Sequence, residues 1–271
     1  MSKNSDQFLC IGDEICLYDE EGNELIAEDP LETRACARRA VSGNGDLTLK
    51  AESIGTRIFR VEPQQSYSEQ RALEQFIGDE EERESLYYEG SPDELIELSV
   101  LESKVTKERA QNQTERRRLH GTPVLYGEVI QLYNAHFKKY LTVTGQTCKA
   151  DVSHLQVNLS KEVIGYFRIV PRYRIRVDGE PVRLGDTVAI KCLRPEGFLN
   201  VGTKALRSDV FNADYYEVFT HTQISSWTLK CHRSAHSLAN TSNAKCINAG
   251  QYIRFYHKEM EGYLESSVLK R

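Results

Sequence analysis

One short pattern recurs four times along this chain and constrains its fold more than any other feature. Each copy starts with a glycine, has Ile or Val three positions later, and places two large apolar or aromatic residues thirteen and fourteen positions after the glycine. Internal repetition of this kind determines architecture before local propensity does. Each copy predicts a β-hairpin, in which an alternating strand and a polar turn lead into a second strand. The four glycines are Gly12, Gly127, Gly185 and Gly250.

A second signal closes each of the first three copies. Phe59, Phe167 and Trp227 each begin a short apolar stretch 40 to 47 residues after the glycine of their repeat. That distance accommodates about four strands of 5–6 residues with their turns. Three such units predict a mainly β fold, a β-trefoil, in which six barrel strands are capped by three hairpins and no strand edge of the barrel is left open. An ordinary antiparallel sandwich with coincidental glycines is the alternative, and the constant spacing argues against it.

The first two glycines are 115 residues apart, whereas the later gaps are 58 and 65 residues. The excess predicts an insert at about residues 66–119. Ser66 and Glu69 form a capping-box pattern, an apolar stripe follows, and Gly78 ends it. Ser91-Pro92-Asp93-Glu94 is a stronger helix start, and the chain then contains no Gly or Pro before Gly121. We expect a helix-turn-helix arm, with Leu95, Leu98, either Leu101 or Glu102, and Val105 along one side of its second helix.

Composition excludes several classes of protein. The net charge of −5 argues against a general polyanion binder, and the basic run at 104–118 is better explained as a solvated helix face. No apolar run is long enough to cross a bilayer, and the N-terminus lacks the core of a signal peptide. Seven scattered cysteines indicate reduced thiols in the cytosol rather than a disulfide framework. We therefore expect no nucleic-acid partner and no direct membrane insertion.

The chain carries no recognisable catalytic or cofactor motif. It has no phosphate-binding glycine loop, no nucleophile elbow and no zincin motif, and Gly43-Asn-Gly45 is better explained as a tight turn. One cluster has metal-ligand residue types, but its spacing matches no standard zinc pattern. It consists of Cys231, His232, His236 and Cys246. We expect no catalytic residue, no cofactor and no metal, and hence no enzyme.

Several stretches of the chain strongly resemble the N-terminal region of inositol 1,4,5-trisphosphate receptors, the intracellular calcium-release channels. Ryanodine receptors are similar in outline but match less well through residues 111–143. The resemblance covers essentially the whole chain. The stretches that carry it are Phe8–Asp13 with Leu17-Tyr18, Phe59–Pro63 with Tyr67-Ser68, Gln111–Glu115, Leu119–Thr122, Tyr126–Leu132, Lys139–Val143, Pro171–Arg176 and Gly185–Val188.

The resemblance implies a function as well as a fold. In that family the first trefoil with its helical arm is a suppressor domain, which lowers the ligand affinity of the next two domains and transmits ligand binding to the gate. It would act on the cytoplasmic face of the endoplasmic reticulum membrane, with the other domains and neighbouring subunits of a tetrameric channel as partners. A loop with Pro171, Tyr173, Arg174 and Arg176 would form the inter-domain or inter-subunit contact, with Tyr173 matching the gating tyrosine. The residues alone favour a simpler interpretation, in which Tyr173 caps a strand end.

The fourth repeat predicts the domain organisation. We expect the suppressor-like trefoil to occupy residues 1–232, and residues 233–271 to form a linker and the first hairpin of a second, truncated trefoil. The resemblance places the family's phosphate-binding loop beyond Arg271, and one hairpin cannot make a trefoil. We therefore expect this chain alone not to bind inositol trisphosphate with useful affinity.

Two other functions fit a trefoil. One is a ryanodine-receptor-like N-terminal module. The other is a carbohydrate- or protein-binding trefoil, although lectin trefoils usually carry a Gln-x-Trp signature in each repeat and this chain has only Trp227. A role as a luminal partner of mannosyl-transfer enzymes, which share the hairpin repeat, is disfavoured by the missing signal peptide.

Overall fold

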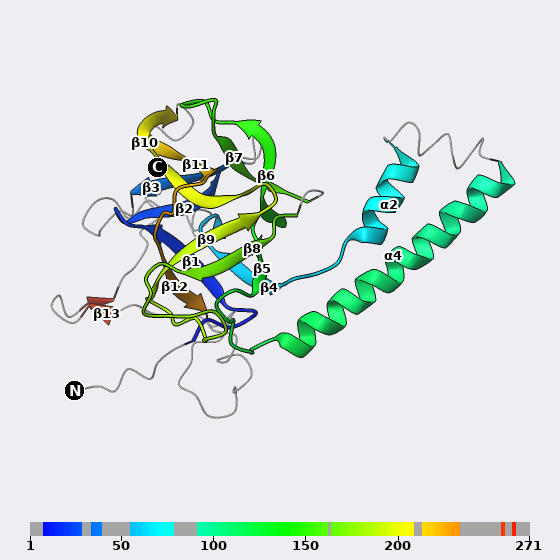
Figure 1. Cartoon of the computed structure of the whole chain (residues 1–271), viewed down its shortest axis with the longest axis horizontal. Coiled ribbons are helices and arrows are strands. Elements are labelled where there is room, and N and C mark those ends of the chain that lie inside the picture. The colour runs from blue at the N-terminus through cyan, green and yellow to red at the C-terminus, as the bar shows by residue number, and fades with distance from the viewer. Residues whose placement is uncertain are drawn as a thin grey trace. The chain divides into compact units, whose positions relative to one another are not determined.

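The structure is a computed structural model that describes residues 8–28, 34–39, 55–78, 91–161, 164–208, 213–233, 256–257 and 262–263. Its contacts divide the chain into two compact units, Met1–Ala235 and His236–Arg271. The first unit is mainly β, with one large antiparallel sheet and two long helices (Figure 1). The mainly β fold with a helical insert is therefore confirmed.

Six strands of the first unit pair in a closed ring. Strand β1 pairs with β4, β4 with β5, β5 with β8, β8 with β9, β9 with β12, and β12 returns to β1, all antiparallel. A closed ring leaves no unpaired edge strand in the barrel, as a trefoil requires. The ring strands are β1 (Glu14–Asp19), β4 (Phe59–Pro63), β5 (Val129–Asn134), β8 (Phe167–Pro171), β9 (Thr187–Leu193) and β12 (Trp227–Arg233).

Three hairpins close one end of this ring. Their inner strands pair with one another, β3 with β7, β7 with β11, and β11 with β3, so the hairpins form a triangular cap. This is the pairing of the β-trefoil expected from the repeats. The hairpins are β2 (Asn23–Glu28) with β3 (Arg34–Arg39), β6 (Lys139–Thr147) with β7 (Leu155–Ser160), and β10 (Glu196–Ser208) with β11 (Ala213–His221).

The first three repeat glycines occupy equivalent places. Gly12, Gly127 and Gly185 have φ values of 92°, 87° and 87°, a region that residues with a Cβ rarely adopt. The N–H of each donates to the carbonyl two residues after the closing aromatic of its repeat, in Val61, Ile169 and Leu229 respectively. The repetition in the sequence is thus a repetition of backbone hydrogen bonds.

A second set of bonds joins the three repeats directly. Leu9 N–H donates to Val182, Val182 N–H to Val124, and Val124 N–H to Leu9, at 2.8–2.9 Å. Each residue lies three positions before its glycine. The cycle of three bonds shows that the repeats are related by a pseudo-threefold arrangement, with the helical insert interrupting it once.

The closing aromatics fill the core of the barrel. Phe59, Phe167 and Trp227 are completely buried and belong to one apolar cluster with residues from all three repeats. The indole Nε1–H of Trp227 donates to the carbonyl of Leu199 at 2.9 Å, so the one polar atom of the ring is also satisfied.

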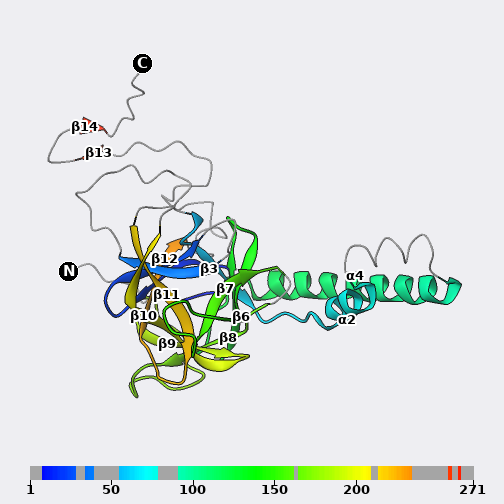
Figure 2. The ribbon, with the colours of Figure 1, turned by 90° about the horizontal axis from the view of Figure 1, so that it is seen from above.

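The insert forms two helices, α2 (Ser68–Ile77) and α4 (Pro92–Leu119), which lie side by side (Figures 1 and 2). The predicted start of α4 is confirmed, because Ser91 and Glu94 form a complete capping box with proline at the first helical position. Gly78 ends α2, also as predicted. Of the expected apolar stripe on α4, Leu98 and Val105 are buried, whereas Leu95 is exposed.

The predicted cap of α2 is wrong. Ser66 does not cap this helix, and Tyr67 at the N-cap makes no side-chain capping bond. Glu108 of α4 takes this role, because its carboxylate accepts the N–H groups of Glu69 and Gln70, each at 3.2 Å. The hydroxyls of Ser66 and Ser68 donate to the same carboxylate at 3.0 Å. A cap supplied by a partner helix is invisible to a local capping rule.

The cap makes α2 sensitive to acid. Burial favours the neutral acid, but the four hydrogen bonds outweigh it and lower the pKa of Glu108. A carboxylate with a depressed folded-state pKa stabilises above its unfolded value of about 4.3, and the stabilisation is lost as pH falls through the folded pKa. Below the folded-state pKa of Glu108 we expect the Glu69 and Gln70 amides to lose protection, measured as the ratio of intrinsic to observed exchange rate at each pH. Glu108→Gln should weaken the cap by ~1 kcal/mol at neutral pH and remove the acid step. Hydrogen exchange measures both, with exposed Glu97→Gln as control; equal behaviour of the two variants would contradict the assignment.

The base of the arm is tied to the barrel by a buried carboxylate. Glu62 on β4 is 1% exposed. Its carboxylate forms ion pairs with Arg60 of the same strand, at 2.6 Å, and with Arg116 in the last turns of α4. Two cations compensate the charge of Glu62, which would otherwise be costly to bury. The ion pairs therefore hold the end of α4 against the barrel.

The second unit contributes one short hairpin to the described residues. Strand β13 (Tyr256–His257) pairs with β14 (Gly262–Tyr263), with Tyr256 opposite Tyr263. This is the expected turn region of the fourth repeat. Gly250 and the rest of the predicted hairpin lie outside the described residues.

Candidate interaction loop

The loop predicted to make contacts joins two barrel strands. Pro171 ends β8, where it pairs with Val188 of β9. The chain then leaves the sheet and returns at Pro181, which forms an isolated bridge with Leu125. We call residues 172–180 the β8–β9 loop. Both ends of the loop are held by backbone pairing, so it is a defined protrusion of the barrel.

Three apolar side chains of this loop face solvent. Tyr173 is 56% exposed, Ile175 82% and Val177 60%. Single exposed apolar residues are ordinary, but three at alternate positions of one loop make a cluster of the kind that marks an interaction site. Arg174, between the first two, is also exposed and adds a cation.

A partly buried network of polar side chains holds the base of the loop. Arg176 Nε contacts Asp186 Oδ2 at 3.1 Å, and the Tyr126 hydroxyl donates to the same oxygen at 3.1 Å. Burial and the adjacent Asp186 carboxylate together raise the pKa of Tyr126, so the phenol stays protonated. The hydrogen bond to Asp186 also raises the pKa of Arg176. Arg176 therefore anchors the loop.

Arg172 supports Tyr173 from the side. Its guanidinium carbon lies 5.4 Å from the centroid of the Tyr173 ring, within cation–π range. Its Nε donates to the Ser226 hydroxyl at 2.8 Å, and Ser226 is buried next to Trp227. Arg172 thus links the exposed tyrosine to the closing segment of the third repeat.

The structure separates the four predicted contact residues. Tyr173 and Arg174 are exposed in the loop, Pro171 lies at a strand end, and Arg176 is half-buried in an ion pair. Sequence reasoning missed the exposed Ile175 and Val177. The alternation of apolar and basic residues in Tyr-Arg-Ile-Arg-Val could have revealed them.

The expectation of no metal site stays a prediction. Within the described ranges, no group of three or more His, Cys, Asp or Glu side chains could hold a metal ion. Two members of the suspected cluster, His236 and Cys246, lie outside those ranges, and Cys231 is half-buried. In the part of the chain that the structure describes, no helix is both long enough and apolar enough to cross a bilayer.

The family model described as inositol 1,4,5-trisphosphate/ryanodine receptor matches residues 4–238. The match spans the barrel, the arm and the β8–β9 loop, and the family is one of receptor channels rather than of enzymes. It confirms the resemblance that the repeats and motifs indicated. The chain therefore belongs to the inositol 1,4,5-trisphosphate/ryanodine receptor family, of which it carries the N-terminal domain.

Proposed function

We propose that this chain is the regulatory N-terminal module of an intracellular calcium-release channel. It lowers the affinity of the following domains for inositol trisphosphate and couples ligand binding to the gate. The module works at the cytoplasmic face of the endoplasmic reticulum membrane, within a tetrameric channel. Coupling of this kind is a free energy linking two sites through a change in contacts between domains.

The observation that carries the proposal is the exposed face of the β8–β9 loop. Tyr173, Ile175 and Val177 expose apolar surface, and burying that surface against a partner is favourable because it is removed from water. The barrel already holds the loop, so the loop loses little conformational entropy on binding. Aromatic residues and arginine dominate the energetics of protein interfaces, and Tyr173 with Arg174 supplies both. The partner is another domain of the channel, on the same or a neighbouring subunit.

The affinity effect can be measured on a longer chain that includes the complete ligand-binding domains. Deleting residues 1–232 from it should raise the affinity for inositol trisphosphate roughly tenfold, within the usual range of allosteric coupling. Titration calorimetry with both proteins gives the ratio. Equal affinities would refute the suppressor role. A chain with Tyr173→Ala serves as the matched comparison, because it keeps the domain and alters only the contact loop.

The 271-residue chain itself should not bind inositol trisphosphate with useful affinity. The second unit contributes a single described hairpin, β13–β14, whereas a trefoil needs three hairpins and a closed ring to position ligand-binding side chains. Calorimetry should give no saturable heat at micromolar concentrations. Binding at micromolar affinity or tighter would contradict this.

A further inference from the structure

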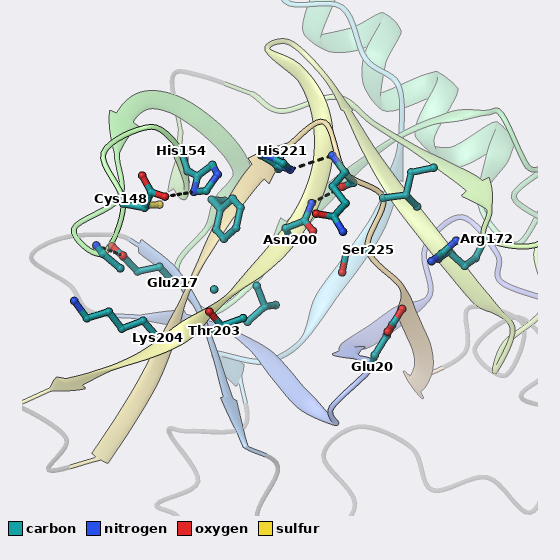
Figure 3. Close-up of a pocket in the computed structure, with 17 residues that line it drawn as sticks. Glu20, Cys148, His154, Arg172, Asn200, Thr203, Lys204, Glu217, His221 and Ser225 are labelled. Carbon is teal, nitrogen blue, oxygen red and sulfur yellow. Dashed lines mark hydrogen bonds and ion pairs between the residues drawn. The ribbon is translucent and has the colours of Figure 1, made fainter.

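A recess on the barrel is lined mainly by residues of the third repeat, with contributions from the first two. Its volume is about 600 Å³, within the range of small-molecule sites. Strands β10 and β11, the turn that follows β6, and the segment before β12 form its walls. Figure 3 shows Arg172 and Glu20 at one side, His154, Cys148, Glu217 and Lys204 at the other, and Asn200 and Ser225 between them.

Two of the three acidic groups in the recess already accept hydrogen bonds from close donors. Glu217, 2% exposed, accepts the N–H groups of Lys149 and Ala150 at 2.8 and 2.7 Å. Asp151 accepts the N–H and hydroxyl of Ser153 and lies 3.5 Å from the His154 imidazole. These carboxylates are part of the wall, and their remaining capacity for a cation is small.

Arg172 differs from these carboxylates because the two terminal nitrogens of its guanidinium have no bonded acceptor among the described residues. Its Nε donates to Ser226 and its guanidinium carbon lies 5.4 Å from the centre of the Tyr173 ring. The two terminal nitrogens face Ser225 across the recess (Figure 3). A guanidinium presents paired donors that match a carboxylate or phosphate. The nearest unpaired acid on the rim is Glu20, which is exposed and forms no ion pair with the described residues.

We propose that this recess binds an anionic group, a carboxylate or a phosphate, at the terminal nitrogens of Arg172, and that Tyr173 senses its occupancy. Ser225 lines the same recess opposite the guanidinium and offers a hydroxyl donor to the anion. The Glu20 carboxylate on the rim weakens binding of the anion. A bound anion partly neutralises the guanidinium charge that attracts the Tyr173 ring. Binding therefore weakens the cation–π contact and makes the tyrosine side chain more mobile. The functional consequence, though not the binding itself, rests on the proposed role of the β8–β9 loop.

The test titrates the full 271-residue chain with inorganic phosphate and with citrate at constant ionic strength, with glycerol as an uncharged control. Amide resonances of Tyr173, Ser225 and Ser226 should shift saturably with either anion and not with glycerol. Arg172→Gln should weaken binding at least tenfold, as expected for loss of a charge-assisted bidentate contact. Glu20→Gln should strengthen it roughly threefold by removing a like charge. Lys204→Ala, at the far side, should leave it within about twofold.

The variants also separate the possible failures. If Arg172→Gln proves poorly folded, Arg172→Lys serves in its place. Lysine keeps the charge but lacks the planar pair of donors, so this variant should bind the anion with an affinity between those of the unchanged chain and Arg172→Gln. Unchanged affinity in both Arg172 variants, or shifts that do not saturate, would overturn the site. Saturable binding that leaves Tyr173 unmoved would overturn the coupling. Tyr173→Ala should still bind phosphate, so anion binding remains measurable even if the loop proves to have no role in channel regulation.

Discussion

Replacing Trp227 by alanine should destabilise the first unit by about 4 kcal/mol, the largest effect we expect from one side chain. The indole is completely buried among residues of all three repeats, and the surrounding barrel strands are held by pairing on both sides, so the cavity cannot collapse. The substitution also leaves the Leu199 carbonyl without its donor. Denaturant unfolding monitored by circular dichroism measures the change.

The matched control is Trp227→Phe. Phenylalanine occupies the equivalent place in the other two repeats, at Phe59 and Phe167, so the barrel accommodates its shape. We expect this variant to lose the hydrogen bond and part of the buried area, at a cost of about 1–2 kcal/mol. If the alanine variant lost less than the phenylalanine variant, the closing aromatic would not hold the barrel together.

Tyr173→Ala should abolish most of the coupling in a channel that carries this module while leaving the fold unchanged. The side chain is 56% exposed, so its loss should change the free energy of unfolding by less than about 0.5 kcal/mol. At a contact, loss of an anchoring aromatic typically costs 2 kcal/mol or more, a factor of roughly 30 in affinity. Ligand-evoked calcium flux and the melting temperature, measured on the same variant, separate the two effects.

Two controls sharpen that experiment. Tyr173→Phe keeps the ring and its contact with Arg172, so it should retain most of the flux. Val152→Ala removes an apolar side chain that is more exposed, at 75%, and lies outside the β8–β9 loop, and it should change neither flux nor stability. Normal flux in the Tyr173→Ala channel would show that the loop does not carry the coupling.

The limits of prediction from sequence are clear at the two helices of the arm. The start of α4 is determined by Ser91, Pro92 and Glu94, which act on one another within a single turn. The start of α2 is determined by Glu108, about forty positions away in the chain, and the local Ser66 pattern was misleading. Capping rules describe neighbours in sequence, so they fail where a partner helix supplies the acceptor.

The contact loop shows the same division. Sequence singled out Tyr173 and Arg174, which are exposed, but grouped them with Arg176, which is engaged by Asp186. It also passed over Arg172, whose partner Ser226 is 54 positions away, and over the exposed Ile175 and Val177. Burial and ion pairing of loop side chains depend on distant segments, which no periodic pattern records.

By itself, the sequence determined the number of repeats, the place of the insert and the closing aromatics. These follow from positive-φ glycines and strand alternation, which are local properties of the backbone. Only the tertiary structure decided how the repeats bond in a cycle through Leu9, Val124 and Val182, which loop side chains are anchors and which are free to bind, and that Arg172 joins the loop to a recess. Those outcomes depend on contacts between residues far apart in the chain, formed only when the barrel closes.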